Sequence, residues 1–252
     1  TPLYDFVDEE NVRQTVWEVK RSDTVEAIAA MFQHIPCAYI ADGHHRTASA
    51  VKVAQQMREE AKAAGTYTGR EPFNYFLSVL FPASQLTILP YNRVVKDRCG
   101  LSADQLVERV RQAGFTVEPA NAPVAPQEAG RMGMFADGQW WNLSLGQELA
   151  RQVAAADPVS ALDVSILQEQ VLSPILGIGD PRLDPCISFV GGIRGTDELE
   201  RCAGTEGVAF SMCATGIDQL LAVADAGLLM PPKSTWFEPK LRSGLFIHQI
   251  HK

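Results

Sequence analysis

The feature that most constrains this chain is a junction between an apolar run and a long helix-forming segment. Residues 38–41 (Ala-Tyr-Ile-Ala) predict a buried strand. Residues 47–64 are rich in Ala, Gln, Glu, Lys and Met and predict a helix. Between them lies the sequence Asp-Gly-His-His-Arg at positions 42–46. A strand that turns through a glycine into a helix directs free N–H groups and the positive end of the helix dipole to one place.

Charged and titratable side chains gather at this junction. The imidazoles of His44 and His45 and the guanidinium of Arg46 suit an anion, and the carboxylate of Asp42 precedes Gly43. A phosphate group beside a residue that can accept a proton fits this set best. An Asp-Gly pair is also an ordinary turn signal, and a lone histidine is more often structural than catalytic. Four polar functional residues at one junction nevertheless favour a functional site.

Composition narrows the classes of partner. A chain of 252 residues with net charge −8 lacks the basic face that binding to nucleic acid needs. No apolar stretch approaches the roughly 18 residues that span a bilayer, and we expect no signal peptide. The five cysteines are scattered and form no C-x-x-C pair, so neither a disulfide framework nor a zinc site is predicted. We therefore expect a small-molecule substrate, no nucleic-acid or membrane partner, and a reducing cytoplasm.

The start of the chain reads like the middle of a longer sequence. The first residue is Thr1, and the residues that follow it (2–6) are Pro-Leu-Tyr-Asp-Phe. We expect a fragment or a processed product.

Apolar periodicity predicts an α+β fold with mixed or antiparallel sheets and interleaved helices, without the βαβ run of a Rossmann sheet. Helices are predicted over residues 25–32, 102–113, 158–177, 196–203 and 218–226. Strands are predicted over residues 73–82, 86–95, 115–118, 186–190, 208–213 and 245–247. Asp137-Gly138 predicts a hairpin that joins residues 131–136 and 139–145.

The signature residues 41–46 (Ala-Asp-Gly-His-His-Arg) resemble those of a bacterial and archaeal family known as domain of unknown function 1015. That family is similar to free-serine kinases built on a ParB/sulfiredoxin-like domain. Further segments fall in the same order as in those kinases: 106–118, the hairpin at 137–138, 207–225 and 232–235. The resemblance spans most of the chain, with strong identity in the signature and in the Pro-Lys-Ser-Thr stretch at 232–235.

The resemblance implies a kinase that transfers phosphate from a nucleotide or pyrophosphate to an amino-acid hydroxyl, that of free L-serine above all. Residues 1–100 would form the ParB/sulfiredoxin-like nucleotide-binding part. Residues 101–252 would form a second α+β part that contributes the Pro-Lys-Ser-Thr stretch. The cofactor would be ATP or ADP, or pyrophosphate in their place, with Mg²⁺ held mainly by phosphates and water.

Residue roles follow from the same resemblance. Asp42 and His45 are the candidate catalytic residues, with Asp42 facing the substrate hydroxyl. His44 and Arg46, together with His45, would contact the phosphate oxygens. Gly43 would let the backbone approach the phosphates closely, and Thr47 and Ala48 would offer backbone N–H groups. The residues that would lie near the substrate are Lys233, Ser234 and Thr235.

Other interpretations stay open. The kinases carry a catalytic Glu upstream of the signature, for which the candidates are Glu9 and Glu10 or a residue that precedes Thr1. A nucleotide-binding switch or hydrolase in the ParB manner, acting through a partner, and a former enzyme kept as a ligand-binding module are the alternatives. A metal site at the signature is disfavoured, because adjacent histidines on one loop rarely converge on one ion.

Several residues outside the signature are less informative. We expect one buried ring in the strand pair Trp140-Trp141, and a turn at residues 180–182. Two roles are open for Lys233, Trp236 and Lys240: they either hold the C-terminal segment in place or act at the site. The remaining histidines, expected at the surface or in the tail, are His34, His248 and His251.

Overall fold

The computed structural model describes residues 1–9 and 11–250, and the chain divides into two compact units, residues 1–40 and 41–252. In the first unit, the hairpin of β1 (Tyr4–Val7) and β2 (Arg13–Val16) precedes α1 (Ser22–Phe32). The Arg13 guanidinium donates to the Asp5 carboxylate across the hairpin at 2.7 and 2.8 Å. The helix predicted over residues 25–32 is confirmed.

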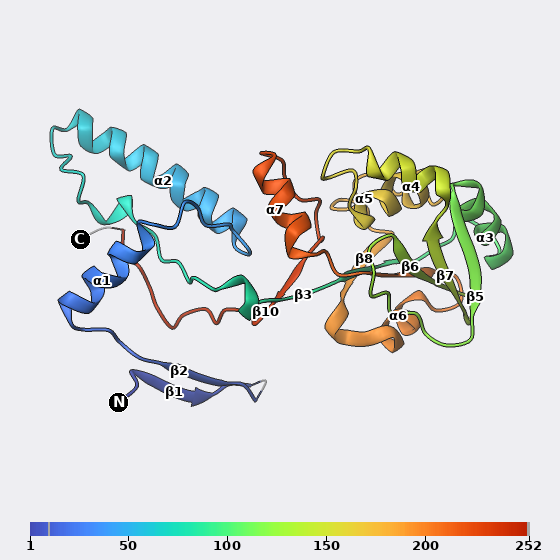
Figure 1. The fold of residues 1–252 in the computed structure, drawn as a ribbon, viewed down its shortest axis with the longest axis horizontal. Helices are drawn as coiled ribbons and strands as arrows, with labels where there is room; N and C mark the ends of the chain where they lie inside the picture. The colour runs from blue at the N-terminus through green and yellow to red at the C-terminus, as the bar shows by residue number, and fades with distance from the viewer. Residues whose placement is uncertain (10, 251–252) are drawn as a thin grey trace. The chain divides into compact units, whose positions relative to one another are not determined.

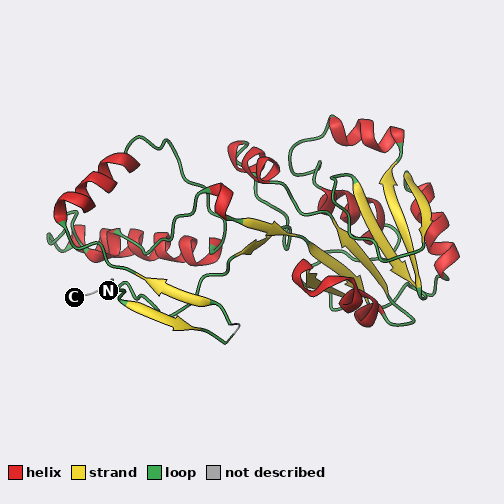
Figure 2. Ribbon diagram, turned by 60° about the horizontal axis from the view of Figure 1, so that its bottom comes forward, coloured by secondary structure: helices red, strands yellow, loops and turns green. Residues whose placement is uncertain are grey.

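An antiparallel six-stranded sheet in the order β5-β7-β6-β9-β4-β8 organises the described part of the second unit (Figure 1). Its strands are β4 (Tyr91–Val95), β5 (Phe115–Ala120), β6 (Arg131–Ala136), β7 (Gln139–Leu145), β8 (Ile187–Gly191) and β9 (Val208–Met212). Figure 2 shows the same strands with the helices beside them. The predicted α+β class, with antiparallel sheets, is confirmed.

Alternation along the strands places apolar side chains on both faces of this sheet. Phe210 packs in the larger core with α3 (Ala103–Gln112), α4 (Gln147–Ala154) and α5 (Asp163–Leu167). The neighbouring Ala209 packs on the opposite face with α6 (Gly195–Ala203). Trp141 and Trp140 divide in the same way, and both rings are buried. The expectation of one buried ring was wrong, because helices cover both faces of the sheet.

The remaining elements of the second unit lead to the signature. Helix α2 (His44–Ala63) begins within the signature itself. Strand β3 (Thr87–Leu89) pairs with β10 (Trp236–Glu238), which brings the tail of the chain beside the start of β4. Helix α7 (Ile217–Asp225) connects β9 to the segment that carries the Pro-Lys-Ser-Thr stretch.

Local sequence signals predict several elements well. Ser102 caps α3 in a capping box with Gln105, and Gly114 follows the helix with φ 98°. The hairpin around Asp137-Gly138 has the predicted bounds. Three further strand predictions and the two short helices after residue 195 agree with β5, β8, β9, α6 and α7.

Four predicted elements are wrong or only partly right. Residues 38–41 and 245–247 form no strand, and residues 73–82 form only the short 3-10 turn η1 (Pro72–Asn74). Among the described residues, no strand lies alongside these apolar runs to satisfy their backbone groups. The helix predicted over residues 158–177 is shorter: α5 passes into the π-helical turn η3 (Gln168–Leu172) and stops before Pro174, which cannot donate a backbone hydrogen bond.

Candidate functional site

The signature forms the N-terminus of α2. Gly43 precedes the helix with φ 85°, a left-handed conformation that glycine adopts without strain. The Thr47 N–H donates to the Gly43 carbonyl at 2.9 Å, which closes the first turn. No described side chain caps this end, so the N–H groups of the first turn remain available to a ligand. A helix of 20 residues directs the positive end of its dipole to this point.

The Asp42 carboxylate lies between three positively polarised groups. Oδ1 accepts a hydrogen bond from the Gly43 N–H at 2.6 Å and lies 3.9 Å from Nη2 of Arg46. Oδ2 lies 3.3 Å from Nζ of Lys240. Burial by itself would raise the pKa of Asp42, but the Gly43 N–H and the charges of Lys240 and Arg46 outweigh it and lower the pKa. Asp42 is therefore ionised at neutral pH and partnered by two cations.

Gly43 also makes room for the Arg46 side chain. A Cβ atom at position 43 would lie 3.3 Å from Nη2 of Arg46, so the guanidinium folds back over the glycine. This close approach, together with the positive φ, explains why the junction carries a glycine. The signature thus holds the guanidinium beside the helix start.

The other signature residues surround the same helix start. The side chains of His44 and His45 are exposed and make no hydrogen bond or ion pair with a described residue. Thr47 is half-buried, and Ala48 is exposed. Both imidazoles are accessible to a ligand at the N-terminus of α2, and their roles remain predictions.

A series of ring contacts connects the signature to the Pro-Lys-Ser-Thr stretch. Nζ of Lys240 lies 5.1 Å from the centroid of the Trp236 ring as well as beside Asp42. The centroid of the Trp236 ring is 5.2 Å from that of Tyr91. Nζ of Lys233 in turn lies 5.1 Å from the Tyr91 ring centroid. Contacts in this distance range are favourable for cations and aromatic rings. The two motifs are therefore parts of one connected surface.

Within the Pro-Lys-Ser-Thr stretch, the side chains divide by burial. Ser234 is 4% exposed, and its hydroxyl donates to the Pro231 carbonyl at 2.5 Å. The Ser234 carbonyl accepts from the hydroxyl of Thr215 at 3.2 Å. Lys233 is exposed and Thr235 is half-buried. The serine hydroxyl thus stabilises the turn, whereas the lysine is accessible.

Sequence reasoning found the signature but did not place its partners. It left Lys240 evenly divided between pinning the tail and acting at the site, and the structure places its ammonium on Asp42. Tyr91 was missed, although its position in a predicted strand was the available signal. Glu9 is exposed in the first unit, and Glu10 lies outside the described residues.

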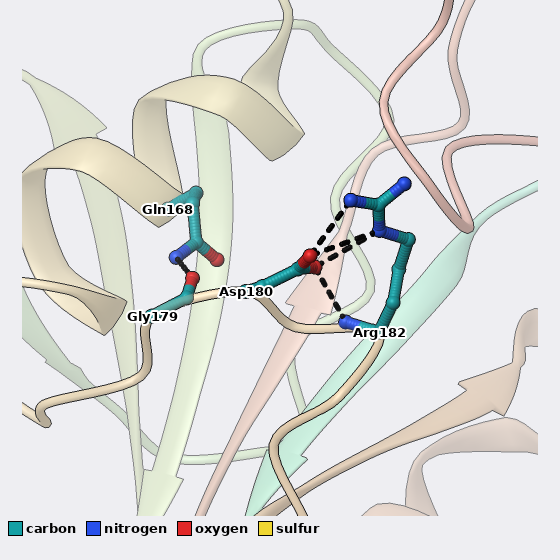
Figure 3. Close-up of polar contacts among 4 residues, drawn as sticks. All are labelled: Gln168, Gly179, Asp180 and Arg182. Carbon is teal, nitrogen blue, oxygen red and sulfur yellow. Dashed lines mark hydrogen bonds and ion pairs between the residues drawn. The ribbon is translucent and has the colours of Figure 1, made fainter.

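The structure also places the remaining histidines and the turn that the sequence predicts at residues 180–182. Nε2 of His248 lies 2.9 Å from the Pro72 carbonyl, His34 is exposed, and His251 lies outside the described residues. Residues 180–182 form the predicted turn, in which the Arg182 guanidinium pairs with the Asp180 carboxylate (Figure 3).

Within residues 1–9 and 11–250, no three His, Cys, Asp or Glu side chains form a group that could hold a metal ion. A helix long and apolar enough to cross a membrane is also absent from those residues.

Fold and site together define an α+β protein that presents a helix N-terminus, a carboxylate and several cations on one surface. The chain belongs to the family described as protein of unknown function (DUF1015), whose profile matches residues 1–165. No curated protein matches the chain.

Three solved structures are similar to part of this fold. A free serine kinase mutant in complex with AMP is 14% identical, with a TM-score of 0.41 over 87% of this chain and 81% of that chain. A conserved hypothetical protein from Pyrococcus furiosus is 14% identical, with a TM-score of 0.38 over 79% and 68% of the two chains. SbnI from Staphylococcus aureus, truncated at its C-terminus, is 17% identical, with a TM-score of 0.36 over 67% and 55%.

Proposed function

We propose that this protein is a small-molecule kinase that holds the phosphates of a nucleotide or of pyrophosphate at the N-terminus of α2. One observation carries the proposal: the uncapped helix start, the Arg46 guanidinium and the Lys240 ammonium all surround the Asp42 carboxylate. Helix N-termini bind phosphate through free N–H groups, and arginine adds a planar pair of donors.

Binding of the phosphates would raise the pKa of Asp42. In the structure the carboxylate is the partner of Arg46 and Lys240, and its pKa is lowered. A phosphate that takes over these two cations leaves the carboxylate with less positive charge, so the pKa of Asp42 rises. Asp42 would then be a better base for the hydroxyl of the acceptor, a role typically worth about 10²–10⁴ in rate.

The remaining signature residues would complete the phosphate site. Phosphoryl transfer depends mainly on positioning and on neutralising charge around the transferred group. The exposed imidazoles of His44 and His45 would donate hydrogen bonds to phosphate oxygens, with His45 as the second catalytic candidate. Thr47 and Ala48 belong to the first turns of the helix that approaches the phosphates. Mg²⁺, when bound, would neutralise phosphate charge and would be held mainly by the phosphates and water.

The acceptor would be an amino-acid hydroxyl, that of free L-serine in the first place. Lys233 is exposed at the far end of the series of contacts from Asp42 through Lys240, Trp236 and Tyr91. Ser234 would contribute by shaping the turn, because its hydroxyl is bonded to the Pro231 carbonyl. In this proposal, residues 1–100 form a ParB/sulfiredoxin-like nucleotide-binding part, and residues 101–252 supply the acceptor side.

Phosphorus NMR of the protein with Mg²⁺ and ATP, ADP or pyrophosphate, with and without L-serine, tests the proposal. The expected result is a new phosphomonoester signal that requires serine and is lost in the Asp42→Asn variant. Loss of nucleotide without serine would instead identify a ParB-like hydrolase. Unchanged spectra in every mixture would contradict transfer and leave a ligand-binding module.

A further inference from the structure

A cavity of about 350 Å³ lies on the side of the Pro-Lys-Ser-Thr stretch that faces α5 and η3. Its apolar walls come from Phe189 on β8 and from Pro231 and Pro232. Gln168 lines it as well and donates to the carbonyls of Ile178 and Gly179 at 2.9 and 3.0 Å. Figure 3 shows that contact to Gly179 beside the turn at residues 180–182, which forms another wall.

The most unusual group in this cavity is the guanidinium of Arg93. The residue is 4% exposed, and its guanidinium donates hydrogen bonds to two backbone carbonyls of the described chain, those of Tyr91 and Lys233, the latter at 3.0 Å. No described carboxylate lies within ion-pair distance of it. Burial lowers the pKa of Arg93 to about 10, so the group is still charged at neutral pH.

Buried charges in proteins are normally paired, because an isolated charge is costly to remove from water. A guanidinium has five N–H donors, and the two carbonyls use two of them. The Phe189 ring, with its centroid 5.5 Å from Cζ, covers one face of the group. Arg93 is thus fixed in orientation, with donors left for an anionic group in the cavity.

Of the two acidic residues in the cavity wall, Asp180 and Glu169, one forms an ion pair and the other does not. Asp180 is occupied by Arg182, with Oδ2 2.7 Å from Nη2 (Figure 3). Glu169 lines the cavity and makes no ion pair with a described residue. The wall therefore offers one buried cation without an anion, Arg93, and one exposed carboxylate, Glu169, that makes no ion pair with a described residue. A ligand that carries both charges would match them.

We propose that this cavity binds a small amino acid as its zwitterion, with the carboxylate on Arg93 and the ammonium group facing Glu169. A dianionic phosphate would compensate Arg93 but would add repulsion from Glu169 and Asp180. A simple carboxylate would satisfy Arg93 and leave Glu169 without a partner. The inference does not depend on phosphoryl transfer, because it needs only the charges of the cavity wall.

The test is a chemical-shift titration of the full chain with glycine, L-serine, acetate and inorganic phosphate, without nucleotide or Mg²⁺. We expect glycine or L-serine to bind more tightly than acetate or phosphate. Arg93→Met should weaken amino-acid binding roughly 10- to 100-fold, as expected for loss of a buried charge-assisted contact. Binding that is unchanged in a folded Arg93→Met variant overturns the proposal, as does phosphate binding that is tighter than amino-acid binding and is weakened by Arg93→Met.

Glu169→Gln provides a second variant that does not remove a buried charge. It should weaken glycine binding several-fold and leave acetate binding unchanged. Glu59→Gln makes the same change of charge at an exposed position of α2 outside the cavity and should alter neither. Equal loss of glycine binding in both glutamate variants, or in neither, contradicts the proposal.

Asp42→Asn separates this inference from the proposed kinase activity. Amino-acid binding that survives Asp42→Asn and is weakened in Glu169→Gln assigns the ligand to the cavity even if no phosphate is transferred. Binding that disappears in Asp42→Asn alone would place the amino acid at the signature and overturn the inference.

Discussion

Nζ of Lys240 lies 3.3 Å from Oδ2 of Asp42, although the two residues are 198 positions apart in the chain. The contact places the tail of the chain against the signature at the N-terminus of α2. It gives Asp42 a second cation in addition to Arg46, which lies on the first turn of the same helix. The carboxylate is therefore held by one local and one distant partner, and the distant one can be removed without altering the helix.

Lys240→Gln should raise the pKa of Asp42, because the lysine charge is among the causes that lower it. A carboxyl NMR titration of both proteins measures this shift. The variant should also lose stability. A carboxyl whose pKa is lower in the folded than in the unfolded chain stabilises the fold above its unfolded pKa, and this contribution is lost as pH falls through its folded pKa. Acid unfolding of the variant should therefore begin at a higher pH. Identical titration curves would contradict the contact.

Gly43→Ala tests the close approach at the helix start. Alanine at φ 85° is strained by about 1–2 kcal/mol, and its Cβ would lie 3.3 Å from Nη2 of Arg46. Gly65→Ala, after the other end of α2, carries similar strain at φ 68° but meets no atom within 4 Å. Urea unfolding should show a loss of stability in both variants. Only Gly43→Ala should also weaken binding of ADP, and equal binding in both would contradict the role of Arg46.

Asp163 should make stability depend on pH in the opposite sense to Asp42. Burial raises the pKa of Asp163 to about 6, while the Gly130 N–H donates to its Oδ1 at 2.8 Å. Because the folded protein holds this proton more tightly, stability should fall between about pH 4 and 6, by on the order of 2 kcal/mol, and then level off.

The Asp163→Asn variant should lack most of this fall, since an amide can still accept from Gly130 without ionising. Urea unfolding of both proteins at intervals from pH 4 to 7 is the measurement. Parallel curves for the two proteins would show that Asp163 titrates in the folded state as it does in the unfolded chain.

Ser234→Ala distinguishes a role in the turn from contact with substrate. The hydroxyl is buried and donates to the Pro231 carbonyl, so its removal should cost about 1 kcal/mol of unfolding free energy. Ser211→Ala is the matched control, because that buried hydroxyl also donates to a carbonyl, that of Val124 at 2.6 Å. Turnover should change little in either variant. A large loss of turnover in Ser234→Ala alone would mean that the hydroxyl contacts substrate.

Much of the fold could be predicted where the signal was local. The capping box of Ser102 and the Asp137-Gly138 turn set element bounds within a few residues, as did the apolar run at residues 208–213. The strand predicted over residues 73–82 was wrong, because a strand also needs a neighbouring strand to pair with, and the propensity of the run itself does not show whether one is present. Val79 and Leu80 are exposed at 53% and 55%.

The site could be predicted only in part for a related reason. Residues 42–46 are adjacent in sequence, so their shared position at a helix start follows from local pattern. The contact of Lys240 with Asp42 depends on how β10 pairs with β3, which no local pattern fixes. Arg93 looked like an ordinary strand residue, because its burial without a carboxylate partner becomes visible only in the folded chain.

The most direct test of the account is calorimetric titration of ADP into the wild-type protein, the Arg46→Gln/Lys240→Gln variant and the Lys52→Gln/Lys62→Gln variant. Both variants lose two positive charges, but only the first changes the cations around Asp42. We predict that the first variant binds ADP at least about tenfold more weakly, as expected for loss of charge-assisted contacts to phosphate, and that the second binds like the wild type. Equal affinities in the two variants would contradict the proposal that the signature holds the donor phosphates.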